Sequence, residues 1–260
     1  MPDAKLIPAG TAVAGDQVNV FVHGYRSMVS DSEVEKAKAR VQRTGVPGES
    51  YLLRWMAGRW ADSATVVGLR AAYRATRLRY LISPASVLID AGLIGVNEAA
   101  QFKRMEWRAA KVGQQLPALL GRVAGGRPIN LIAHSLGARV VHHCLAEADL
   151  AGLLLRDVVL LAGAADLKSD NWPECVARLD GRLYNGYSHK DRILKITPDL
   201  RRRVGSRPLP QVLIDGVPKV VNHQCIGYGH VQSWTRLPEL LPQIWPACCG
   251  ASQGDTETDA

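Results

Sequence analysis

The residues Ala133-His134-Ser135-Leu136-Gly137 carry the strongest chemical signal in the sequence, because a serine here separates an apolar run from a long helical pattern. A nucleophile elbow has this context, since a sharp strand-to-helix turn exposes the serine hydroxyl. Small residues are needed two places before and after the serine, where strand and helix nearly touch. Gly137 meets this rule, and Ala133 adds one methyl group. The alternative interpretation is that Ser135 only caps a helix.

A serine nucleophile needs a general base and an acid that orients that base. We predict that His230 is the base, because the glycines of Gly227-Tyr228-Gly229 let its loop return over the sheet edge. We predict that Asp191, in Ser188-His189-Lys190-Asp191, is the acid. The alternatives left open are His223 for the base and Asp166, Asp199 and Asp215 for the acid, of which Asp166 is the main rival.

The order of these residues along the chain separates the families that share this chemistry. Ser135, Asp191 and His230 follow the order Ser-Asp-His, which is the order in α/β-hydrolases. Other folds with the same three groups arrange them differently along the chain.

An oxyanion hole requires backbone N–H groups aimed at the developing negative charge. We predict one from Leu136, which follows the serine, and one from Tyr25, which follows His23-Gly24 at the end of an early apolar run. His23, Gly24 and His134 are also candidate substrate-binding residues. For the His23 side chain we favour a structural role beneath the turn.

Continuously apolar runs alternate with helical patterns, which is typical of a parallel sheet buried on both faces. The sequence therefore predicts an α/β-hydrolase fold with a mostly parallel sheet flanked by helices. The expected strands are 18–22, 50–55, 129–133, 158–162, 182–185 and 219–222, and the expected helices are 31–43, 138–150, 171–179 and one at the C-terminal end.

One domain is expected over residues 1–249, since 260 residues with 47% hydrophobic content suit a single core. Residues 61–126 are predicted to form a helical cap inserted into this domain. Residues 197–218 are expected to form a loop or hairpin. The polar segment 250–260 is expected to be a disordered tail.

The chain carries a net charge of +8, which favours anionic partners such as an acidic membrane surface. The arginines at 70, 74 and 77 share a helical spacing, and those at 201, 202 and 203 form a second cluster. Each group could contact lipid or form a solvated face. Basic residues are not interleaved with aromatic ones, so nucleic acid is not expected as a partner.

Five cysteines without a CxxC pair indicate neither a zinc site nor a disulfide framework. We expect no metal, no cofactor and a reducing compartment such as the cytoplasm. The sequence shows no signal peptide and no convincing membrane span, so peripheral membrane attachment or export without a signal stays open. It does not predict the oligomeric state.

Four segments resemble the α/β-hydrolase family of uncharacterised function typified by the transmembrane and coiled-coil domain proteins. These segments are AHSLGARVVHHCL, VVLLAGAAD, GRLYNGYSHKD and GHVQSW. The resemblance implies a serine-hydrolase triad at Ser135, Asp191 and His230, with lipase- or esterase-like activity. We expect cleavage of a lipid or other hydrophobic ester through an acyl-enzyme. The alternatives are a non-catalytic binding protein of the same fold and a phospholipase-type toxin effector.

Overall fold

The computed structural model describes residues 4–10, 13–24, 28, 30–55, 84–168, 171–195 and 203–249. For residues 84–102 it describes the helical backbone only. The predictions for Tyr25, for Asp199, for Arg201 and Arg202 and for the whole of 61–83 therefore lie outside the described residues, as does the predicted tail at 250–260.

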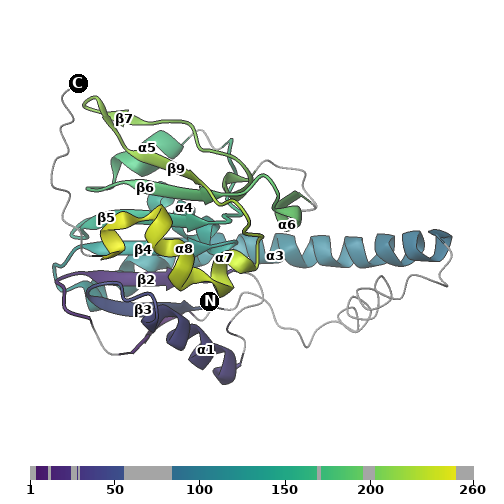
Figure 1. Ribbon diagram of the computed structural model, residues 1–260, viewed down its shortest axis with the longest axis horizontal. Coiled ribbons are helices and arrows are strands. Elements are labelled where there is room, and N and C mark those ends of the chain that lie inside the picture. Colours follow the sequence, from purple (N-terminus) through teal and green to yellow (C-terminus); the bar gives the residue numbers. More distant parts are fainter. Residues whose placement is uncertain are drawn as a thin grey trace.

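A seven-stranded sheet forms the centre of the molecule (Figure 1). Its strand order is β1-β3-β2-β4-β5-β6-β9, and every neighbouring pair is parallel except β1 with β3. The strands are β1 (Lys5–Pro8), β2 (Val18–Val22), β3 (Glu49–Arg54), β4 (Ile129–His134), β5 (Leu155–Leu161), β6 (Leu183–Tyr187) and β9 (Val220–Gln224). All six predicted strands are present, whereas β1 was not predicted.

Helices cover both faces of the sheet, as Figure 1 shows. One face packs against α3 (Pro84–Ala124), α4 (Gly137–Glu147) and α5 (Trp172–Ala177). The other packs against α1 (Asp31–Gln42) and α8 (Leu237–Ile244). The remaining short elements are α6 (Arg192–Lys195), α7 (Gln232–Thr235), the 3-10 turns 204–206 and 246–249, and a hairpin of β7 (Leu213–Ile214) and β8 (Val217–Pro218).

Local sequence explains why these elements form. Every residue of β2 and β4 is buried, so each strand has apolar neighbours on both faces of the sheet. Helix α1 begins at Ser30, whose side chain accepts from the Glu33 N–H while the Glu33 carboxylate accepts from the Ser30 N–H. This capping box satisfies N–H groups that the helix itself leaves without partners.

Helix α3 differs from the predicted cap. Its C-terminal half packs in the core, with Met105, Ala109, Val112, Leu116 and Leu120 all buried. The prediction of a cap over 61–126 is therefore wrong for 105–126, because buried residues at helical spacing place this part against the sheet and α4. The N-terminal half of α3 projects beyond the sheet (Figure 1). A cap formed by the preceding residues stays a prediction.

The strand order, the parallel pairing and the helices on both faces confirm the predicted α/β-hydrolase fold. Within the described residues, no helix combines the length and the apolar character needed to cross a bilayer.

Candidate active site

Ser135 occupies a strained turn between β4 and α4. Its φ is +55°, a left-handed backbone conformation that residues other than glycine rarely adopt. The backbone of Ser135 is held on both sides, because its N–H donates to the Leu161 carbonyl (3.0 Å) and its carbonyl accepts from the Ala164 N–H (2.8 Å). The turn therefore presents the hydroxyl from a fixed position at the carboxyl end of β4.

Two glycines allow the close approach that this turn requires. A Cβ on Gly137 would meet the main-chain carbonyl of Val22, so helix α4 begins directly against the end of β2. A Cβ on Gly24 would lie 2.6 Å from Ser135 Cβ and 3.1 Å from its Oγ. Both contacts agree with the small residues expected around a nucleophile elbow.

Three side chains that are far apart in the sequence form a hydrogen-bonded relay. His230 Nε2 lies 2.8 Å from Ser135 Oγ, and His230 Nδ1 lies 2.8 Å from Asp191 Oδ2. With the proton on Nδ1, His230 donates to the carboxylate and accepts from the serine hydroxyl at Nε2. The loops after β6 and β9 meet here because these parallel strands are neighbours in the sheet.

Asp191 is fully buried, with 0% of its surface exposed. Its second carboxylate oxygen, Oδ1, accepts from the Leu194 N–H at 3.0 Å, and its own N–H donates to the Ser188 carbonyl at 3.1 Å. A buried carboxylate needs such partners, because burial removes water from it. The loop therefore holds the carboxylate in one orientation toward His230.

The three rival residues that the structure describes lie elsewhere. Asp166 is half-buried after β5, where its Oδ1 accepts from the Lys168 N–H. Asp215 is exposed in the turn between β7 and β8, at a φ of +51°. His223 lies within strand β9, seven residues before the loop position that His230 occupies.

One predicted N–H of the oxyanion hole belongs to Leu136, which is the N-cap residue of α4. The first N–H groups of a helix have no partner within the helix and bear partial positive charge. This end of α4 therefore suits a developing negative charge beside Ser135.

His134 holds the loop that carries His230. Its Nε2 lies 2.9 Å from the His230 main-chain carbonyl, and its ring stacks on Trp234 at a centroid distance of 5.7 Å. Burial lowers the pKa of His134 to about 3, and the charge of His230 acts in the same direction. His134 therefore stays neutral at ordinary pH and donates from Nε2. The sequence identified His134 as a substrate-binding candidate but not this contact.

His23 is buried in the core beneath the turn, which is the structural position favoured for it. Its Nδ1 lies 2.8 Å from the Gly24 carbonyl, and its ring stacks on Trp55. Burial lowers the pKa of His23 to about 4. Its exposed fraction is 1%, so contact with a substrate would require the surrounding residues to move.

Arg203 is not part of a basic surface, contrary to one interpretation of the 201–203 cluster. Its side chain is fully buried and pairs with Glu106 of α3 at 3.0 Å. The same guanidinium donates to the Ala164 carbonyl at 3.0 Å, and Ala164 in turn donates to Ser135. Sequence analysis missed this link between α3 and the elbow, because no local pattern pairs residues 97 positions apart.

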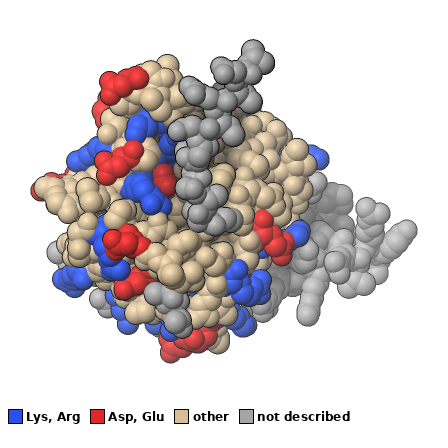
Figure 2. Space-filling model, turned by 60° about the vertical axis from the view of Figure 1, so that its left-hand side comes forward, with Lys and Arg blue, Asp and Glu red and all other residues tan. Residues whose placement is uncertain are grey.

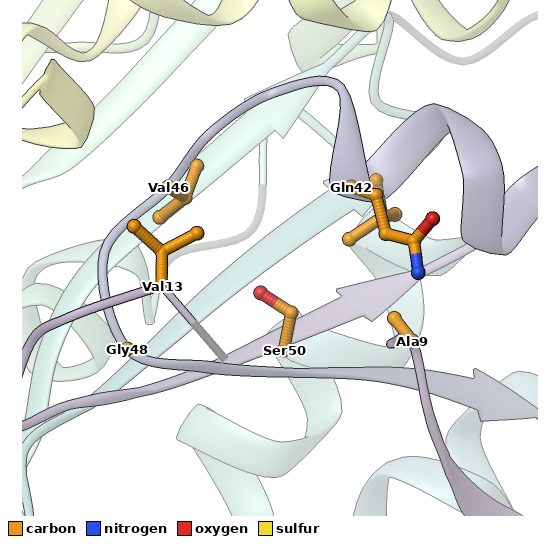
Figure 3. A pocket seen from close by; sticks show the side chains of 7 residues that line it. Ala9, Val13, Gln42, Val46, Gly48 and Ser50 are labelled. Atoms are coloured by element: carbon orange, nitrogen blue, oxygen red, sulfur yellow. The ribbon is translucent and has the colours of Figure 1, made fainter. Parts of the chain in front are cut away.

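A cavity of about 260 Å³ lies at the opposite edge of the sheet, beside the start of β3 (Figure 3). Its polar side chains are Gln42 and Ser50, and its other lining residues are Ala9, Val13, Val41, Val46 and Gly48. Among the described lining residues there is no acid or base for the Ser50 hydroxyl, so nothing here indicates a second nucleophilic site.

Comparison with known proteins finds a matching family model and several related sequences. A family model described as "Protein of unknown function (DUF726)" matches residues 4–245. A transmembrane and coiled-coil domain-containing protein of Oryza sativa is 31% identical over 217 residues, covering 79% of this chain and 32% of the relative. An uncharacterized membrane protein of Caenorhabditis elegans is 35% identical over 148 residues, covering 53% and 23%.

A probable lipase of Saccharomyces cerevisiae is 32% identical over 144 residues, covering 53% of this chain and 13% of the relative. The chain thus spans less than a third of the length of these curated relatives. Among solved structures, MenH from S. aureus gives a TM-score of 0.49 at 11% identity, covering 96% and 100% of the two chains.

Proposed function

This chain belongs to the DUF726 family, and we propose that it is a serine hydrolase that cleaves carboxylic esters through an acyl-enzyme on Ser135. The observation that carries the proposal is the relay in which His230 lies 2.8 Å from Ser135 and 2.8 Å from Asp191. A strained serine, a loop histidine and a buried aspartate together supply a nucleophile, a base and an orienting acid.

In the first step Ser135 Oγ attacks the ester carbonyl carbon, and its proton passes to His230 Nε2. The carbonyl electron pair moves onto the oxygen, where the Leu136 N–H stabilises the negative charge. Asp191 stabilises the imidazolium. The tetrahedral intermediate then collapses, and the leaving alkoxide takes the proton from His230.

In the second step water attacks the acyl-enzyme carbonyl and gives its proton to His230. The second tetrahedral intermediate expels Ser135 Oγ, which recovers the proton from Nε2, and the carboxylic acid leaves. His230 thus serves as base and then as acid in each half of the reaction.

The proposed substrate is a hydrophobic ester, such as a lipid. Similarity to a relative named a probable lipase supports this class, although it covers 53% of this chain. Thioesterases, peptidases and acyltransferases use the same groups, so the ester bond needs its own test.

Labelling by a fluorophosphonate probe tests the nucleophile. We expect labelling of the folded wild type, loss of labelling in Ser135→Ala, and unchanged labelling in Ser206→Ala, whose hydroxyl donates to the Arg203 carbonyl. A wild type that is folded by circular dichroism yet unlabelled would point to a non-catalytic binding protein.

A panel of p-nitrophenyl esters of graded chain length tests whether the bond that is cleaved is an ester. If the labelled protein hydrolyses none of them, the ester assignment fails.

A further inference from the structure

Three exposed aliphatic side chains lie on the two loops that carry Asp191 and His230. Ile193 is 44% exposed and follows Asp191 by two positions. Val231 is 58% exposed and directly follows His230, and Ile226, at 79%, lies four positions before it. We call Ile193, Ile226 and Val231 the apolar rim.

Hydrogen bonds bring the members of the apolar rim to one edge of the sheet. The 2.8 Å contact between His230 and Asp191 joins the two loops at their centre. A second bond, from the Cys225 N–H to the Tyr187 carbonyl (2.8 Å), joins them where β9 and β6 end. In Figure 1, α6 and α7, which adjoin these loops, lie at the same end of the sheet.

Exposed aliphatic side chains scattered singly over a surface are ordinary, whereas several at one functional edge indicate an interaction. Among the described residues, eight large apolar side chains are exposed, and three of the eight form the apolar rim. Three of the others are exposed singly and lie away from the two loops. Leu154 directly precedes β5, and Leu213 and Val217 belong to the β7–β8 hairpin.

The sequence of the two loops has an excess of basic residues. Between positions 187 and 195 and between 222 and 236, the Lys and Arg residues are Lys190, Arg192, Lys195 and Arg236, of which Arg236 pairs with Glu239 of α8 at 2.5 Å. The single Asp or Glu in these segments is Asp191, which is fully buried against His230. By contrast, the face in Figure 2 carries basic and acidic side chains intermixed. Basic residues beside apolar ones favour a surface that is both anionic and apolar.

We propose that the apolar rim and its basic neighbours dock on an anionic lipid surface, so that the ester enters the site directly from the lipid. This docking proposal rests on the proposed function, and it adds that the ester substrate is part of a lipid layer. The position of the rim favours lipid over a protein partner, because a rigid partner over Asp191 and His230 would cover the site. A fluid lipid layer instead delivers ester molecules at the same place.

Cosedimentation with vesicles tests the docking. The protein carries Ser135→Ala, so that binding is measured without hydrolysis, and the vesicles contain phosphatidylcholine with or without phosphatidylglycerol. The rim variant is Ile193→Ser with Ile226→Ser. The matched control is Leu154→Ser with Leu213→Ser, which removes two side chains of similar exposure, 47% and 60%. Neither variant changes the net charge.

We expect binding to phosphatidylglycerol vesicles to be at least about tenfold weaker in the rim variant and unchanged in the control, because aliphatic burial in lipid is lost. Omitting phosphatidylglycerol should weaken binding of the parent protein. With Ser135 restored, the rim variant should hydrolyse a water-soluble p-nitrophenyl ester within about twofold of wild type, while losing activity on the same acyl group dispersed in vesicles.

Equal vesicle binding by the rim and control variants would overturn the docking proposal, as would a rim variant that alters only self-association in sedimentation velocity. The two proposals fail separately. If vesicle binding depends on the rim but no fluorophosphonate labels Ser135, the docking stands and the hydrolase assignment fails. If labelling and soluble-ester hydrolysis occur without rim-dependent binding, only the docking fails.

Discussion

His134 Nε2 lies 2.9 Å from the main-chain carbonyl oxygen of His230, so the residue beside the nucleophile holds the loop of the proposed base. Elbow and loop are 96 positions apart in the sequence. Because His134 is stacked on Trp234 and stays neutral, its position and its donor N–H are both defined. The distance between the Ser135 hydroxyl and the His230 ring thus depends on the hydrogen bond from His134 to the His230 carbonyl.

We expect His134→Ala to lower kcat on a soluble p-nitrophenyl ester by about 10–100-fold, because the His230 ring would no longer be held in line with the Ser135 hydroxyl. The KM should change little, since this hydrogen bond does not involve the ester. His134→Gln retains an N–H donor and should recover part of the lost rate. A parallel rise in KM with no recovery in His134→Gln would argue for a substrate-binding role instead.

Asp191→Asn should lower kcat by about a thousandfold or more, because the amide neither favours the Nδ1–H tautomer of His230 nor stabilises the imidazolium. The matched control is Asp166→Asn, at the rival acid, which should keep activity within a few-fold of wild type. Steady-state kinetics on the same ester measure both. The reverse pattern would make Asp166 the acid and contradict the role proposed for Asp191.

Gly137→Ala should destabilise the protein by about 2–3 kcal/mol, because the new methyl group would press on the Val22 carbonyl, which belongs to a buried strand. Gly121→Ala is the control, since its Cβ would meet nothing within 4 Å inside helix α3. That change should be neutral or stabilising by up to about 1 kcal/mol. Urea unfolding measures both free energies, and equal values would show that β2 and α4 do not touch at Gly137.

Stability should fall as the pH drops from about 6.5 toward 4. Burial lowers the pKa of His23 and of His142 to about 4 and that of His134 to about 3. Below pH 6.5 the unfolded chain binds protons at these sites and the folded chain does not, so acid favours unfolding. Between pH 7 and 5 each histidine should cost on the order of 2 kcal/mol.

Urea unfolding at pH 7, 6 and 5 measures this dependence. His142→Gln keeps an amide toward Asn171, which His142 contacts at 3.0 Å, and removes one titrating group. The loss of stability between pH 7 and 5 should therefore shrink by about a third in this variant. An unchanged slope would mean that His142 does not stay neutral in the folded protein.

The order of strands and helices could be predicted because each depends on residues near in sequence. Buried strands appear as apolar runs, and the capping residues Ser30 and Glu33 mark where α1 begins. Strand β1 was missed because it is four residues long and is stabilised by antiparallel pairing with β3, more than 40 positions away. The C-terminal half of α3 was predicted as part of a cap for a similar reason. Its place in the core depends on packing against α4, which lies later in the sequence.

By itself the sequence determined the elbow around Ser135 and a short set of candidate acids and bases. Only the tertiary structure decided that Asp191, rather than Asp166, lies beside His230, and that Arg203 is buried against Glu106. The physical reason is the range of the forces involved. Backbone angles and apolar periodicity are local properties, whereas hydrogen bonds and ion pairs between distant segments exist only once the sheet has brought its carboxyl ends together.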